Sequence, residues 1–164
     1  KPGRFRHSCC GVSRGVLGVA GQLNGTLPRP SMTDYVLYHT HDVMDILLRD
    51  AKDFRAATSR DTDVTGQRVW LIVGKGSPRE YFLVGYFTPE RRSKAPQGQG
   101  DFEWILEAPV SAGVQLKRHQ WVPLKGLKWF HGFLTSQRNF DAGLNLITDP
   151  TQVANLEAAL ATVP

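Results

Sequence analysis

The chain has 164 residues, enough for one domain with a single hydrophobic core and too few for two ordinary domains. It has no apolar run near the roughly 18 residues of a membrane-spanning helix, so no membrane partner is expected. The two cysteines, Cys9 and Cys10, are adjacent and far from the expected core. This excludes a disulfide framework and predicts a cytoplasmic location.

The positive charge is concentrated in the first 31 residues. The formal net charge is +5, and residues 1–31 hold five Lys and Arg side chains with no Asp or Glu. That leaves 15 Lys and Arg to balance 15 Asp and Glu in residues 32–164. We predict that residues 1–31 are a disordered or non-native basic leader and that Met32 begins a single domain, 32–164. A targeting peptide and a basic arm that touches nucleic acid are the alternatives.

The first elements of the domain are predicted from hydrophobic periodicity. Residues 34–39 have the composition of a short strand. Residues 41–56 predict a helix, because apolar side chains recur at helical spacing from Val43 to Phe54. Residues 57–67 are polar and rich in turn formers.

The middle of the domain predicts a hairpin and a further strand. Arg68–Val73 and Glu80–Phe87 are apolar runs separated by a short turn, which predicts an antiparallel pair. Residues 88–101 predict a mobile loop, rich in Pro, Gly and Gln. Phe102–Val110 alternates apolar and polar residues, as expected for a strand with one solvent-exposed face.

The C-terminal third predicts two short strands and a helix. The strands are expected around Gln115–Trp121 and Lys128–Leu134. The helix begins at about Pro150, with Asp149 as its N-cap. The expected fold is α+β, with a small, curved, mostly antiparallel sheet or open β-barrel flanked by helices.

Two weak patterns suggest metal chemistry. His39 and His41 follow a predicted strand with the spacing of a paired metal ligand. Asp101 and Lys117, the latter in a Q-x-K sequence, are similar to part of the site of some metal-dependent nucleases. Neither pattern is complete, so no cofactor or metal is predicted, and a small metal-dependent hydrolase or nuclease is kept as an alternative function.

Aromatic residues are the more informative set. A cluster of large flat side chains from Trp129 to Phe133 precedes a polar run, Thr135–Asn139, and then Phe140. A pocket for a flat heterocycle needs stacking faces and edge-directed hydrogen bonds, and this segment offers both.

The predicted hairpin, Val69–Gly74 with Tyr81–Phe87, resembles the middle hairpin of PUA-like domains, nearest to the EVE/YTH-type branch. Trp129 and the Asn139-Phe140 pair lie where such domains close their barrel. The resemblance implies a reader that takes a modified or flipped base into an aromatic pocket, with nucleic acid, DNA rather than RNA, as its partner. Similar domains occur attached to nucleases of modification-dependent restriction systems, so a nuclease domain or protein is a further expected partner.

The resemblance also implies roles for individual residues. Trp129 and Phe140 would be stacking walls and Asn139 and Ser136 edge readers, with Tyr38 also in the base-binding set. The phosphate contacts would be Arg91, Arg92, Lys94, Lys117 and Arg118. No catalytic residue is predicted, and whether the chain is an enzyme is left open. A non-catalytic protein-interaction module is the third alternative.

Overall fold

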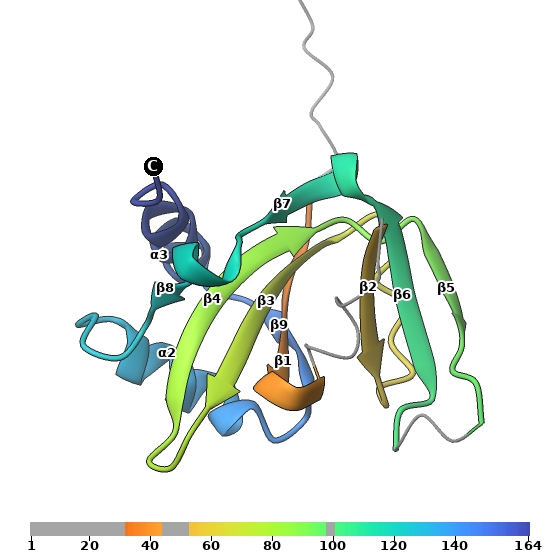
Figure 1. The fold of residues 1–164 in the computed structure, drawn as a ribbon, viewed down its shortest axis with the longest axis horizontal. Coiled ribbons are helices and arrows are strands. Elements are labelled where there is room, and N and C mark those ends of the chain that lie inside the picture. Colours follow the sequence, from red (N-terminus) through yellow and green to blue (C-terminus); the bar gives the residue numbers. More distant parts are fainter. Residues whose placement is uncertain (1–31, 44–52, 98–100) are drawn as a thin grey trace, which may run out of the picture.

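The computed structural model describes residues 32–43, 53–97 and 101–164 (Figure 1). The predicted leader, 1–31, and the middle of the predicted helix, 44–52, lie outside the described residues. The strands are β1 (Asp34–Thr40), β2 (Asp53–Thr58), β3 (Arg68–Lys75), β4 (Glu80–Phe87), β5 (Arg91–Lys94), β6 (Trp104–Pro109), β7 (Gly113–Gln115), β8 (Val122–Pro123) and β9 (Leu144–Ile147). The helices are α2 (Phe130–Ser136), α3 (Pro150–Leu160) and the 3-10 turns η1 (Val110–Ala112), η2 (Arg118–Gln120) and η3 (Arg138–Phe140).

The strands form two sheets. The larger has the order β7-β4-β3-β1-β9, with β8 also paired to β4, and the smaller has the order β2-β6-β5. The β1–β3 pair is parallel and the other described pairs are antiparallel. Neither sheet closes into a barrel. The α+β class and the mostly antiparallel pairing are therefore confirmed.

The larger sheet is covered on both faces. One face packs against β2 and β6 of the smaller sheet through a core that we call the inner layer. The opposite face packs against α2 and α3 through a second core, the helix layer (Figure 1). Strand β3 contributes to both, since Val69 and Leu71 face the inner layer while Trp70 and Ile72 face the helix layer. Burial on both faces explains its continuous apolar sequence.

A bulge in β4 changes which way its side chains point. Ile72 pairs with Leu83 and Leu71 pairs with Gly85, so Val84 is an additional residue on one side of the ladder. As a result, Leu83 and Tyr86 both face the helix layer although three positions separate them. Gly85 adopts a φ of 140° and lies directly against β7. A Cβ there would be 1.9 Å from the carbonyl oxygen of Val114.

The predicted helix 41–56 is wrong at its C-terminal end. Residues 41–43 are helical, but Asp53–Thr58 is strand β2, in which Phe54 pairs with Ala108 of β6. Phe54 fits a helical stripe and a strand equally well by sequence. Pairing with β6 and burial in the inner layer decide in favour of the strand.

Two more expectations are wrong for related reasons. Lys128–Leu134 is not a strand, because α2 covers most of it and buries Phe130 and Phe133 at helical spacing against the larger sheet. The predicted loop 88–101 contains β5, which pairs with β6.

The remaining C-terminal expectations differ in outcome. Beyond Gln115 the predicted strand Gln115–Trp121 gives way to the 3-10 turn η2, and β9 was not predicted. The helix beginning at Pro150 is confirmed, with the Asp149 carboxylate accepting from Thr151 N at 2.8 Å.

A buried carboxylate joins β1, β3 and α3. Asp34 accepts hydrogen bonds from Arg68 Nε and from the buried Trp70 Nε1, the latter at 2.8 Å. The same guanidinium donates to Glu157 of α3 at 2.7 Å and lies 4.8 Å from the Trp70 ring. The first residues of the two parallel strands are thus held by one charge network.

We expect Asp34→Ala to lower the free energy of unfolding by about 2–4 kcal/mol, because it leaves a guanidinium and an indole N–H without their shared acceptor. Glu157→Ala is the matched control. The Glu157 side chain is half-exposed, so its removal should cost less than about 1 kcal/mol. Urea denaturation measures both, and equal losses would contradict the assigned role of Asp34.

We expect Gly85→Ala to destabilise the protein by about 3 kcal/mol, because the added Cβ collides with the β7 backbone in a conformation that L-residues avoid. Gly132→Ala in α2 is the control, since a Cβ there meets nothing within 4 Å. It should be neutral or stabilise by up to about 1 kcal/mol. Thermal melting of the two variants would contradict this account if the Gly85 variant melted no lower than the Gly132 variant.

Candidate functional site

The predicted aromatic walls lie in the helix layer. Phe140 is 2% exposed, and Trp129 packs edge-on against Phe130 and Phe133, with ring centroids 5.9 Å apart in both pairs. Tyr38 stacks on Phe140 at 5.2 Å. These rings fill the space between the larger sheet and α2 by packing on one another.

The predicted edge readers differ in their surroundings. The Ser136 hydroxyl donates to the carbonyl of Phe133 at 2.7 Å and accepts from Gln152 at 3.0 Å. Asn139 is exposed at the centre of a left-handed turn in which Arg138, Asn139 and Phe140 all have positive φ. The buried Phe140 ring anchors this unfavourable backbone to the core.

The basic residues of β5 are matched by acidic neighbours. Arg91 contacts Glu107 at 2.8 Å, Arg92 binds Asp61, and Lys94 lies 3.7 Å from Glu103. The Arg92 and Lys94 cations also lie 3.5 Å and 3.7 Å from the centroid of the Trp104 ring. Their charge is largely balanced locally, and β5 lies at the opposite end of the domain from α2 (Figure 1).

Lys117 and Arg118 lie on an exposed basic turn that ends at Trp121. Lys117 precedes η2, and both cations are exposed. The Arg118 guanidinium contacts His41 Nε2 and lies 5.9 Å from the ring of Trp121. Trp121 is half-buried against the inner layer, and its indole N–H donates to the carbonyl of Leu116 at 3.2 Å.

His41, which directly follows β1, contacts this turn. Its ring lies 5.9 Å from the Trp121 ring in an edge-on arrangement, and its Nδ1 is 3.6 Å from Asp42. The ring centroid of Phe82 in β4 lies 6.3 Å from that of Trp121. An indole, an imidazole and a guanidinium therefore meet where β1 ends.

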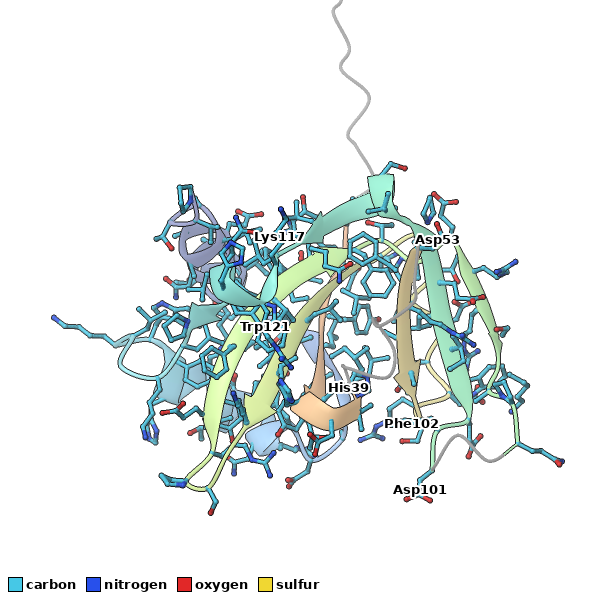
Figure 2. The ribbon with its side chains drawn as sticks, viewed as in Figure 1. His39, Asp53, Asp101, Phe102, Lys117 and Trp121 are labelled. Carbon is cyan, nitrogen blue, oxygen red and sulfur yellow. The ribbon has the colours of Figure 1, made fainter. Side chains whose placement is uncertain are left out.

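His39 lies two residues earlier on β1 and is buried at the edge of the inner layer. It is 4% exposed, and its ring packs edge-on against Phe102 at 5.4 Å (Figure 2). Burial lowers the pKa of His39 to about 4, although a hydrogen bond to the backbone of Ala57 opposes the shift. Nε2 is buried and has no hydrogen-bond partner among the described residues.

The state of this imidazole follows from those contacts. The Ala57 bond favours the protonated ring, so the ring nitrogen donates to the Ala57 carbonyl. A neutral imidazole carries one N–H, and Nε2 is then the nitrogen with a free lone pair. Because β1 belongs to the larger sheet and Ala57 to the smaller, this bond also links the two sheets. We call His39, His41, Phe102, Arg118 and Trp121 the β1-end site.

The metal-type patterns are not assembled in the described part of the chain. His41 turns toward Arg118 while His39 is buried beside Phe102. In Figure 2, Lys117 is labelled near the top of the domain and Asp101 near its bottom edge. Within residues 32–43, 53–97 and 101–164, no group of three or more His, Cys, Asp or Glu side chains is placed to hold a metal ion.

The sequence predictions did not assign a role to Trp121 or Phe102. A tryptophan one turn after Lys117-Arg118-His119 was a usable signal, since aromatic and basic residues alternate on nucleic-acid surfaces. Phe102 carried no such signal, because its contact with His39 depends on the packing of two sheets.

No family model, curated protein or solved structure matches this chain. Among the described residues, no helix is long and apolar enough to cross a membrane.

We expect the burial of His39 to lower the free energy of unfolding as the pH falls. In the unfolded chain its pKa is about 6.5, so below that pH the unfolded state takes up a proton that folded His39 does not. Between pH 7.5 and pH 4 the wild type should lose about 3 kcal/mol more unfolding free energy than His39→Gln.

The exposed His131 supplies the control for this measurement. His131→Gln should lose stability on acidification as the wild type does, because the substitution lies on α2 and leaves the burial of His39 unchanged. Parallel pH profiles for the wild type and His39→Gln in urea denaturation would show that His39 is not held neutral.

Proposed function

We propose that this chain is a PUA-like, non-catalytic reader domain that binds nucleic acid, DNA in preference to RNA, and receives one base at the β1-end site. The observation that carries the proposal is the meeting of Trp121, His41 and the exposed Arg118 where β1 ends, with the exposed Lys117 next to Arg118 in the chain. Stacking faces beside backbone-binding cations are the two requirements for holding an unpaired base.

The distribution of charge supports this location. The domain as a whole is neutral, so phosphate affinity must come from a local group of cations. The β5 cations are paired with Glu107, Asp61 and Glu103. Lys117 forms no ion pair with any of the described residues, and it lies on the same turn as Arg118. We therefore rank Lys117 above the β5 residues as a phosphate contact.

The aromatic residues support the same ranking. Trp129 and Phe140 are packed against other rings in the helix layer, and opening a pocket there would separate α2 from the larger sheet. Trp121 lies on the other face, at the rim of the inner layer. A base that stacks on Trp121 leaves both cores intact.

We expect Trp121→Ala to weaken binding to a fluorescein-labelled single-stranded DNA 12-mer by about 5–100-fold in fluorescence anisotropy, because base stacking on an aromatic ring is lost. Trp129→Ala is the comparison that separates the two aromatic sets. If Trp129→Ala weakens binding and Trp121→Ala does not, the base lies in the helix layer. If the wild type binds neither modified nor unmodified DNA above background at low salt, the reader function is wrong.

We expect Lys117→Ala to weaken binding on all sequences alike and to reduce the slope of log K against log salt by about 1, because one phosphate contact is removed. Lys125→Ala removes an equally exposed lysine outside the site and should change neither quantity. Equal slopes for the wild type and Lys117→Ala in a salt titration would remove Lys117 from the interface.

A further inference from the structure

His39 presents a polar atom that the fold leaves unused. Nε2 is buried and has no hydrogen-bond partner in residues 32–43, 53–97 and 101–164, while the other ring nitrogen is hydrogen-bonded to the backbone of Ala57. Buried polar atoms are nearly always paired, since an unpaired acceptor forfeits its hydration without compensation. An exception inside a candidate binding site therefore points to a missing partner.

Four other buried atoms have no partner among the described residues; Asn145 Nδ2 lies on β9, outside the β1-end site, and the other three have local surroundings that His39 lacks. Arg55 and Arg92 have an unpaired Nε, but both guanidinium groups lie next to carboxylates, Glu107 and Asp61. The Trp104 N–H belongs to a ring already covered by two cations. The His39 ring has an aromatic edge contact with Phe102 instead of a charged neighbour.

The position of His39 connects it to the β1-end site. His39 is the second-last residue of β1, and His41 directly follows the last residue of that strand. His41 contacts both Trp121 and Arg118. Phe102, which packs against His39, precedes β6 and belongs to no strand, and it is only partly buried. For a base held near Arg118 to reach the buried Nε2, the partly buried Phe102 ring beside His39 has to move aside.

We propose that His39 Nε2 accepts a hydrogen bond from an N–H group on the edge of the bound base. The site then binds bases that carry an amino or imino N–H and rejects bases in which this group is fully alkylated. This inference rests on the proposed reader function. A neutral imidazole suits the task because its lone pair accepts from an N–H, whereas an imidazolium would repel it. Monoalkylated amino groups keep one N–H and remain acceptable.

The test uses the full chain and single-stranded 12-mers that differ at one central base. Each of adenine, cytosine and thymine is compared with its blocked counterpart, N6,N6-dimethyladenine, N4,N4-dimethylcytosine and N3-methylthymine. We expect wild-type protein to bind at least one unblocked base about 10-fold or more tightly than its blocked form, because blocking leaves a buried acceptor unpaired. N6-methyladenine should bind like adenine in that comparison.

Two variants isolate the acceptor. His39→Phe keeps a flat ring and removes Nε2, so it should bind blocked and unblocked DNA equally. His39→Gln restores a neutral acceptor and should recover part of the discrimination. In wild-type protein, adding the unblocked 12-mer should move the ¹⁵N chemical shift of Nε2, a readout that does not depend on either variant folding.

The outcomes separate this inference from the function on which it rests. Binding of all the 12-mers without discrimination, or an unmoved Nε2 shift at saturation, would overturn the role of His39 and leave the reader function standing. Absence of binding to every 12-mer would overturn both.

Discussion

The parallel pairing of β1 with β3 is the constraint on which the rest of this structure depends. Two parallel neighbours cannot be joined by a tight turn, so the chain must leave the larger sheet after Thr40 and return at Arg68. On the way it forms β2, the first strand of the smaller sheet. The smaller sheet covers one face of the larger sheet, and the inner layer forms between them. The end of β1 then lies at the rim of that layer, which places His39 and His41 where the proposed site is.

The charge network around Asp34 belongs to the same constraint. Asp34 and Arg68 are the first residues of the parallel pair and lie opposite each other in the ladder. Their contact, shared with Trp70 and Glu157, aligns the start of both strands and attaches α3 to the sheet. The two strands are thus in register from their first residues to the site at their far end.

Sequence periodicity predicted the β3–β4 hairpin, β6 and the start of α3, because each of these elements is specified by its own residues and a neighbouring turn or cap. It was wrong for β2 and α2. Phe54 fits a strand or a helix, and the partner strand β6 is about 50 residues away. Trp129–Phe133 is aromatic enough for a strand, yet its rings are buried at helical spacing.

The candidate site was less predictable still. His39 and His41 were recognised as a pair with the spacing of metal ligands, but the structure gives them different neighbours, Phe102 and Trp121. Those contacts join segments about 60 and 80 residues away in the chain. The basic residues of β5 illustrate the same limit, because the carboxylates that balance them come from Asp61, Glu103 and Glu107. Composition gives the number of such charges but not which residues lie next to one another in the fold.

The bulge at Val84 and Gly85 shifts the two-residue alternation of side chains along β4 by one position. Before it, Leu83 points to the helix layer, and after it Phe87, four residues on, points to the inner layer. In an unbroken strand the two side chains would share a face. Deleting Val84 would remove the bulge and leave a regular alternation from Leu83 to Phe87, with Tyr86 still facing the helix layer and Phe87 still facing the inner layer. The bulge is therefore the place at which β4 can lose a single residue and keep the chemistry of both faces, whereas a single deletion elsewhere in the strand moves the residues beyond it to the opposite face.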